Sequence, residues 1–328
     1  MGVGANFANI LRKKHNLSIP VDIESLIQEY AILKFKSFPK KTSHIDGVTL
    51  NLKKSDKVEV YININQPSTR IQFTLAHELG HIIIPWHTGN IIDNLYEEST
   101  EDPSSNYSIC ESEADDFASE LLLPSEWIND LVKDISDIEN LKLIIYSLEK
   151  TTKMSHSAIA YKVIQYLNPG FVFVVLNKNG YIEWFKSSIS TNETLSHENK
   201  GQYLFNTSFY KRNKDAYFDI EVNGFKYLWF YTAKEIEIEF DENDTRTEKE
   251  LIRDIVKDLE LEPKFHIASI SSALAFCRQN LQESRSLTFE NLYRVCIEKV
   301  NREEKYRWIT KHPLYKTYIF KRVNKLLS

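Results

Sequence analysis

The stretch FTLAHELGHIII at residues 73–84 carries two histidines four positions apart, His77 and His81, with Glu78 beside the first. Apolar residues flank this H-E-x-x-H sequence on both sides, which predicts a buried helix. Residues four positions apart lie on one face of a helix, so both imidazoles can bind the same metal ion. Glu78 then lies close enough to activate a water molecule without being a ligand itself. The alternative is that the two histidines are ordinary residues of a helix surface.

A third metal ligand has to come from another segment, because a catalytic zinc ion usually takes three protein ligands and leaves a fourth position for water. The stretch ICESEADDFASELLLP at residues 109–124 predicts a helix that ends at its proline. Glu111 and Asp115 lie one helical turn apart, on a face with small residues that allow close helix packing. We therefore expect Glu111 to be the third ligand and Asp115 to accept a hydrogen bond from a ligand histidine. Glu113 lies on another side of this helix and is the second choice for the ligand.

Two further residues near these motifs leave alternatives open. Cys110 directly precedes Glu111, and a thiolate is a good zinc ligand. One hypothesis is that Cys110 gates the site by occupying the fourth position, and the alternative is a small buried residue at a helix start. His87 is either a ligand or an oxyanion donor, or else a loop histidine beyond Pro85.

The composition predicts a folded, soluble protein of the cytoplasm. Hydrophobic residues make up 42% of the 328 residues and charged residues 27%, which provides a packed core and excludes global disorder. Three cysteines without a C-x-x-C pair indicate reduced thiols rather than a disulfide framework. No stretch approaches 18 consecutive apolar residues, so we expect no membrane span. The net charge of −5 gives no whole-protein argument for nucleic-acid binding.

The order of patterns along the chain predicts an α+β protein with two parts. Residues 1–168 combine helices with a small group of strands before the first motif, and they carry both motifs. The turn residues Asn168-Pro169-Gly170 mark the domain boundary, because the apolar period changes from 3.6 to 2 beyond them. Residues 169–328 are predicted to contain a sheet over 171–240 and helices over 246–328.

The C-terminal stretch interleaves basic and aromatic residues, a combination that suits a nucleic-acid backbone and its bases. The candidates for such contacts are Arg307, Lys311, Lys321 and Arg322. The alternative is an amphipathic helix whose basic face is solvated.

Taken together, the two motif helices resemble the ImmA/IrrE family of metallo-endopeptidases, which shows R-x-x-F-T-x-A-H-E-x-G-H and then E-x-x-A-N-x-F-A-x-x-L-L-x-P. The first pattern is matched here by Arg70, Phe73, Thr74, Ala76, His77, Glu78, Gly80 and His81. The second is matched by Glu111, Ala114, Phe117, Ala118, Leu121, Leu122 and Pro124. Asp115 departs from it, since asparagine is usual there. The resemblance covers about residues 5–167.

The resemblance implies a zincin-like fold for the N-terminal part and a zinc-dependent endopeptidase activity. The expected substrate is a cognate helix-turn-helix repressor, whose cleavage relieves repression in a stress, mobile-element or anti-phage response. One zinc ion would be bound by His77, His81 and Glu111, with Glu78 as the catalytic base.

For the C-terminal part, the resemblance implies a GAF- or PAS-like sensor domain, with single-stranded DNA or a small molecule as activator. Two alternatives remain for the whole chain. One is a signal-sensing DNA-binding regulator, and the other is a toxin–antitoxin component, each with a zinc site that does not cleave peptides.

Overall fold

The computed structural model describes the chain except for residues 1, 43, 54–56, 93–105, 234–237 and 284–286. Helices and two four-stranded sheets confirm the predicted α+β class. Contacts divide the chain into two compact units, each assembled from two segments. The first comprises Met1–Leu131 and Leu143–Lys162, and the second comprises Val132–Lys142 and Val163–Ser328. The domain boundary at residue 168 stays a prediction.

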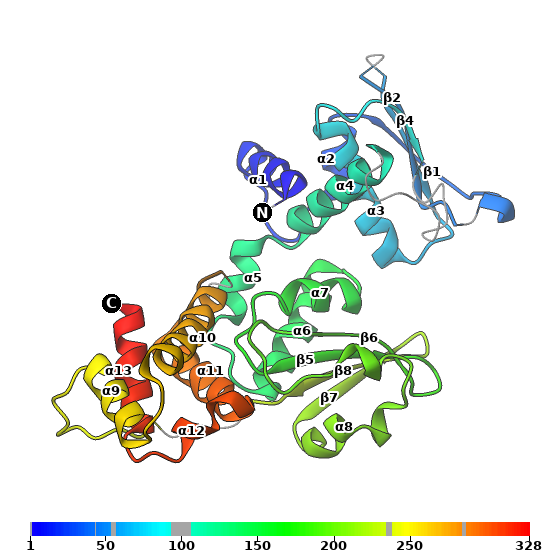
Figure 1. The fold of residues 1–328 in the computed structure, drawn as a ribbon. Coiled ribbons are helices and arrows are strands. Elements are labelled where there is room, and N and C mark those ends of the chain that lie inside the picture. The colour runs from blue at the N-terminus through cyan, green and yellow to red at the C-terminus, as the bar shows by residue number, and fades with distance from the viewer. Residues whose placement is uncertain (1, 43, 54–56, 93–105, 234–237, 284–286) are drawn as a thin grey trace. The chain divides into compact units, whose positions relative to one another are not determined.

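The N-terminal half of the chain alternates helices with short strands (Figure 1). In chain order the elements are α1 (Val3–His15), α2 (Ile23–Gln28), β1 (Ile32–Lys36), η1 (Lys40–Thr42), β2 (Gly47–Leu52), β3 (Glu59–Asn63), α3 (Ser68–Ile83), β4 (Gly89–Ile92), α4 (Asn106–Leu122), α5 (Ser125–Val132), α6 (Ile138–Thr152) and α7 (His156–Val163).

A mixed sheet with the strand order β1-β3-β2-β4 positions the helix that carries the H-E-x-x-H sequence. Strand β1 pairs in parallel with β3, whereas β2 pairs antiparallel with both β3 and β4. Helix α3 packs against β2 and β3, and also against α4. Because the sheet covers α3 on one side and α4 covers it on another, every residue of α3 from Thr74 to Ile82 is buried, and these include the two histidines and Glu78. Polar groups in such a place need specific partners.

Small residues let α4 approach its neighbours closely. A Cβ atom added to Gly80 of α3 would lie 3.1 Å from the ring of Phe117, which is itself fully buried. A Cβ atom added to Gly4 of α1 would lie 1.9 Å from the carbonyl oxygen of Glu113. The backbone of α4 therefore lies directly against α1, and its Phe117 ring lies directly against Gly80 of α3, and this packing places Glu111 next to the two histidines.

The C-terminal half forms a second sheet followed by helices. In chain order the elements are β5 (Phe171–Leu176), β6 (Ile182–Ser187), η2 (His197–Asn199), η3 (Leu204–Asn206), α8 (Ser208–Asn213), β7 (Tyr217–Val222), β8 (Phe225–Tyr231), α9 (Glu248–Asp258), α10 (Pro263–Glu283), α11 (Phe289–Arg302), η4 (Glu304–Tyr306), α12 (Arg307–Thr310) and α13 (Tyr315–Leu327). The sheet is antiparallel throughout, in the order β6-β5-β8-β7.

The predicted sheet region 171–240 is only partly strand. Residues 204–213 form the turns η3 and α8, although their aromatic content is typical of strands. The hydroxyl of Thr207 accepts a hydrogen bond from the backbone N–H of Tyr210 and so caps the start of α8 at Ser208. Phe209 is buried against the sheet. Local capping therefore outweighs strand propensity here. Residues 234–237, which also fall in the predicted region, lie outside the described residues.

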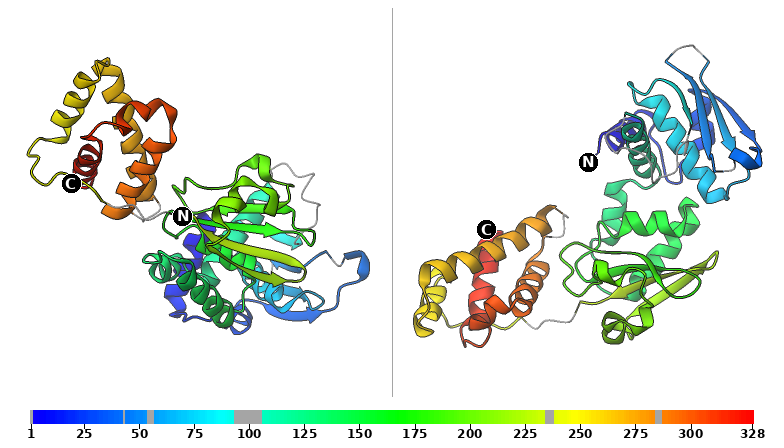
Figure 2. Two further views of the ribbon diagram at one scale, coloured as in Figure 1. Left: turned by 90° about the horizontal axis from the view of Figure 1, so that it is seen from below. Right: turned by 45° about the vertical axis from the view of Figure 1, so that its right-hand side comes forward.

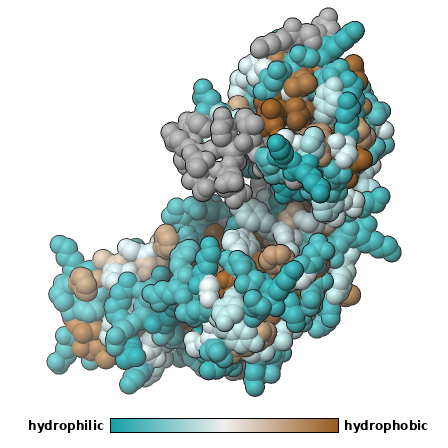
Figure 3. Space-filling view, turned by 90° about the vertical axis from the view of Figure 1, so that its right-hand side faces the viewer, coloured by the Kyte–Doolittle hydropathy of each residue, from teal (hydrophilic) through white to brown (hydrophobic). Residues whose placement is uncertain are grey.

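Helices α9–α13 pack around a core of their own, and both views of Figure 2 draw them as one group of helices, coloured yellow to red. The visible surface is mainly hydrophilic, with small apolar groups separated by polar residues (Figure 3). Among the described residues, no helix combines the length and the apolar character that crossing a membrane requires.

Candidate metal centre

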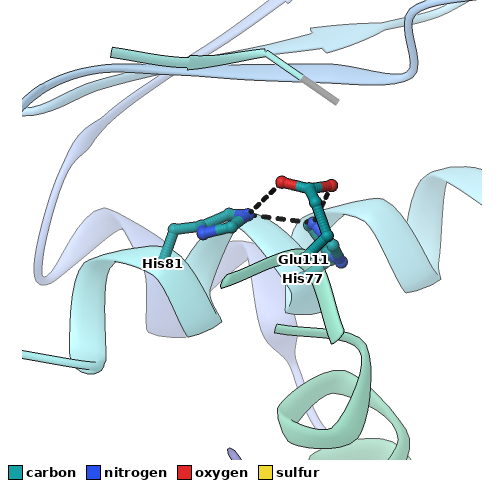
Figure 4. A group of neighbouring side chains, drawn as sticks. All are labelled: His77, His81 and Glu111. Atoms are coloured by element: carbon teal, nitrogen blue, oxygen red, sulfur yellow. Dashed lines mark hydrogen bonds and ion pairs between the residues drawn. The ribbon is translucent and has the colours of Figure 1, made fainter. Parts of the chain in front are cut away.

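The two histidines of α3 point their ring nitrogens at the same place (Figure 4). Nε2 of His77 and Nε2 of His81 lie 3.0 Å apart, and both side chains are buried. The third side chain comes from α4, where Oε2 of Glu111 lies 3.5 Å from His77 Nε2 and Oε1 lies 3.4 Å from His81 Nε2. In the part of the chain that the structure describes, these three residues form a group that could hold a metal ion.

The distances in this group fit a tetrahedral ion. Ligand atoms about 2.0–2.1 Å from a zinc ion lie roughly 3.3 Å from one another at tetrahedral angles. Here the two imidazole nitrogens lie 3.0 Å apart, and each lies 3.4 or 3.5 Å from one oxygen of the Glu111 carboxylate, Nε2 of His81 from Oε1 and Nε2 of His77 from Oε2. Oε1 of Glu111 is buried without a hydrogen bond, and an ion between the three side chains would satisfy it. The residues therefore fit one metal ion with a position left for water.

The charge of Glu111 also suits a metal ligand. Burial by itself raises the pKa of this carboxyl group, but the adjacent imidazoles of His77 and His81 outweigh burial and lower the pKa to about 2. The group is thus ionised at neutral pH, as a ligand oxygen has to be.

Asp115 lies where the sequence analysis expects it. Its Oδ1 is 2.8 Å from Nδ1 of His77, so it can accept the proton of that nitrogen while Nε2 of His77 faces the site. The side chain of Asp115 is 62% exposed, so this partner of His77 is also in contact with solvent.

Glu78 lies against strand β2, a contact that the sequence analysis missed. The hydroxyl of Thr49 donates to Oε2 of Glu78, and a Cβ atom added to Gly47 would lie 2.1 Å from Oε1. Side chains two positions apart in a strand face the same side, so Gly47 and Thr49 share a face. The salt bridge from Arg70 to Asp46 joins α3 to the residue just before β2. The strand pattern of GVTL in the sequence predicts that Gly47 and Thr49 face the same side. Nothing in the sequence predicts that this side contacts Glu78.

His87 is more than a loop histidine. It is fully buried beyond Pro85, and its Nδ1 lies 2.9 Å from Nδ1 of His81. Its Nε2 lies 3.0 Å from Oε2 of Glu113, which also accepts the indole N–H of Trp86 at 2.7 Å. Burial, ahead of the other influences, lowers the pKa of His87. Glu113 and His87 both lie outside the group of three.

Cys110 also lies outside this group. Helix α4 already begins at Asn106, so Cys110 is inside the helix and points about 100° away from Glu111. Burial, followed by the nearby carboxylates, raises the pKa of this thiol, which disfavours the thiolate that binds zinc. The cysteine gate stays a prediction without support from the position of this residue.

The four basic residues of the C-terminal stretch differ in their surroundings. Arg307 is 75% exposed and lies 3.2 Å from Glu304, and Lys311 is exposed. Lys321 donates to the carbonyl oxygens of Asp244 and Arg246. Arg322 is only 20% exposed and lies 3.7 Å from Glu248. Lys321 and Arg322 therefore hold the helical group together, and contact with nucleic acid stays a prediction.

Comparison with known proteins supports the resemblance over part of the chain. Residues 31–163 match a peptidase family model described as the IrrE N-terminal-like domain, and this range includes α3 and α4. No curated protein matches the chain. A solved structure described as a Mycobacterium tuberculosis transcriptional regulator is similar at 13% identity over 71% of each chain. The TM-score of this match is 0.31. Residues 31–163 thus resemble a metallopeptidase domain.

Proposed function

We propose that this protein is a zinc-dependent endopeptidase that cleaves a helix-turn-helix transcriptional repressor. One observation carries the proposal: two buried imidazoles and an ionised carboxylate converge at distances that fit a tetrahedral ion. The match of residues 31–163 to the IrrE N-terminal-like domain supports the peptidase class. The repressor and a stress or anti-phage role follow from the family resemblance, and a cytoplasmic location follows from the composition.

His77, His81 and Glu111 would hold the ion. When bound, zinc supplies Lewis acidity to a water molecule and to the carbonyl of the scissile peptide. Asp115 accepts the Nδ1 proton of His77 and so keeps Nε2 of that ring available as a donor atom. The burial of both histidines lowers the local dielectric constant and strengthens each charge interaction in the site.

Glu78 would move the protons. Its carboxylate would accept a proton from the attacking water and later give it to the leaving amine. The hydroxyl of Thr49 donates to Oε2 of Glu78 and fixes the plane of the carboxylate, while Gly47 leaves room for Oε1. The strand β2 therefore orients the base, and the helix α3 carries it.

The C-terminal unit would regulate cleavage. Its antiparallel sheet and helical group are separate from the residues of the metal centre in the sequence, as a sensor domain would be. We propose single-stranded DNA or a small ligand as the signal, with a GAF- or PAS-like role for the sheet.

The test is incubation of the full chain with candidate helix-turn-helix repressors encoded by neighbouring genes, with and without zinc, a chelator and single-stranded DNA. We expect cleavage that needs zinc. Glu78→Gln should retain zinc and lose cleavage, whereas Glu24→Gln, an exposed glutamate on α2, should behave as the wild type. If Glu78→Gln leaves the response of the repressor unchanged, the zinc site is not proteolytic and a regulator or toxin–antitoxin role is correct.

A further inference from the structure

A chain of hydrogen-bonding groups runs from His81 away from the metal centre. Nδ1 of His81 lies 2.9 Å from Nδ1 of His87, and Nε2 of His87 lies 3.0 Å from Oε2 of Glu113. The indole N–H of Trp86 donates to the same oxygen at 2.7 Å. All four side chains come from α3, the segment after it, and α4.

The protons of this chain can be placed in one way when His81 is a ligand. A neutral imidazole that offers Nε2 to a metal carries its proton on Nδ1. This N–H of His81 has to donate to Nδ1 of His87, which therefore carries no proton. His87 then keeps its proton on Nε2 and donates it to the carboxylate of Glu113. Each donor has an acceptor, and donation runs in one direction from His81 to Glu113.

We propose that His87 and Glu113 are positioning residues that hold His81 in the tautomer that presents Nε2 to the metal. The proposal rests on the metal site of the proposed function. It gives each ligand histidine an acidic partner: His77 reaches Asp115 directly, and His81 reaches Glu113 through His87.

The two arrangements differ in their contact with water. The side chain of Asp115 is 62% exposed, so water can replace it as an acceptor. His87 is fully buried, so its loss removes a hydrogen-bond partner of His81 Nδ1 at a place that water reaches less readily. Substitution of His87 should therefore weaken zinc binding more than substitution of Asp115.

The test is the zinc affinity of the full-length chain, measured by competition with a chromophoric chelator. His87→Phe keeps the ring but removes the acceptor, and we expect the affinity to fall by about 10- to 100-fold. His87→Asn places an amide oxygen at the position of Nδ1 and should remain within a few-fold of the wild type. His156→Phe is the matched control, because this buried histidine lies 2.6 Å from Glu149 and away from the group of three. It should leave the affinity unchanged.

A second pair of variants covers the case in which His87→Phe does not fold. Glu113→Leu removes the acceptor of both His87 and Trp86 and should lower the zinc affinity. Glu113→Gln retains an acceptor oxygen and should restore most of it. Nitrogen-15 NMR of the zinc-loaded, histidine-labelled chain should show His87 protonated on Nε2.

Three results would overturn the proposal: unchanged affinity in a folded His87→Phe or Glu113→Leu variant, equal loss in His87→Asn and His87→Phe, or protonation of His87 on Nδ1. Absence of zinc binding by the wild-type chain would overturn both this proposal and the proposed function. Normal zinc results without any repressor cleavage would overturn the proposed peptidase activity and leave the positioning role intact.

Discussion

Replacing Gly47 by alanine should separate cleavage from zinc binding. The new Cβ atom would lie 2.1 Å from Oε1 of Glu78 and 2.8 Å from Cγ2 of Thr74, whereas ordinary contact begins near 3.4 Å. Glu78 is buried and hydrogen-bonded to Thr49, so its carboxylate has to move within a packed site. The overlap requires a shift of about 1 Å, and a misplacement of that size costs a catalytic group roughly 100-fold in rate.

The assay is kcat/KM for repressor cleavage, with zinc affinity and thermal unfolding measured in parallel. We expect Gly47→Ala to lower kcat/KM by about 100-fold. It should lower the free energy of unfolding by about 1–3 kcal/mol, as overpacking does. Zinc affinity should not change, because the three atoms nearest to the new Cβ belong to Glu78 and Thr74, neither of which is among the three candidate ligands.

The control for this prediction is Gly2→Ala. Its Cβ atom would lie 2.0 Å from Oδ2 of Asp116, an equally severe overlap, but Asp116 is exposed and can turn into solvent. Cleavage by Gly2→Ala should therefore equal that of the wild type. Wild-type kcat/KM in Gly47→Ala would refute the role of β2 in orienting Glu78, and so would a loss of zinc that parallels the loss of cleavage.

Three further predictions concern hydrogen bonds and buried charges. Thr49→Val removes the donor to Glu78 and should lower kcat/KM by about 10- to 100-fold, since a hydrogen bond to a charged group contributes about 1.5–3 kcal/mol. Thr49→Ser keeps the hydroxyl and should retain most of the activity, so an equal loss of kcat/KM in both variants would contradict this role of Thr49. Lys162 and Glu120 form a buried ion pair at 2.8 Å, so Lys162→Met should lower the free energy of unfolding, measured in urea, by about 3–5 kcal/mol. The double variant Lys162→Met, Glu120→Leu should lose less, because it leaves no unpaired buried charge. Burial lowers the pKa of His156, so the unfolded chain binds the proton more readily below about pH 6.5, and stability should fall as the pH drops through this range. In the same unfolding experiment, the free energy of unfolding of His156→Phe should fall less between pH 7 and pH 5 than that of the wild type. An identical pH dependence in both proteins would exclude this contribution of His156.

The sequence predicted which candidate ligands share a helix face, because the distances that decide this are local. His77 and His81 share a face because they are four residues apart on a helix, and the same spacing pairs Glu111 with Asp115 on α4. The structure brings the carboxylate of Glu111 to both histidines, although its role as a ligand remains a proposal. The start of the second sheet at β5 was equally predictable, because the apolar period changes from 3.6 to 2 directly after Asn168-Pro169-Gly170.

The sequence was misleading where local and tertiary preferences compete. Residues 204–213 are rich in aromatic side chains, yet a cap at Thr207 starts a helical turn there. Lys321 and Arg322 read as a solvent-facing basic pair, but Asp244 and Glu248, more than 70 residues earlier, lie beside them. Neither partner can be identified from the periodicity of the terminal helix, because periodicity reports only which face a residue occupies.

The sequence by itself determined the α+β class and which candidate donors share a helix face, His77 with His81 on α3 and Glu111 with Asp115 on α4. These follow from spacings within a single helix or strand, which backbone geometry sets. Only the tertiary structure decided which groups surround the donors: Thr49 and Gly47 beside Glu78, and His87 and Glu113 beyond His81. Such contacts join separate elements, and the close packing of β2, α3 and α4 sets their distances in a way that no local pattern records.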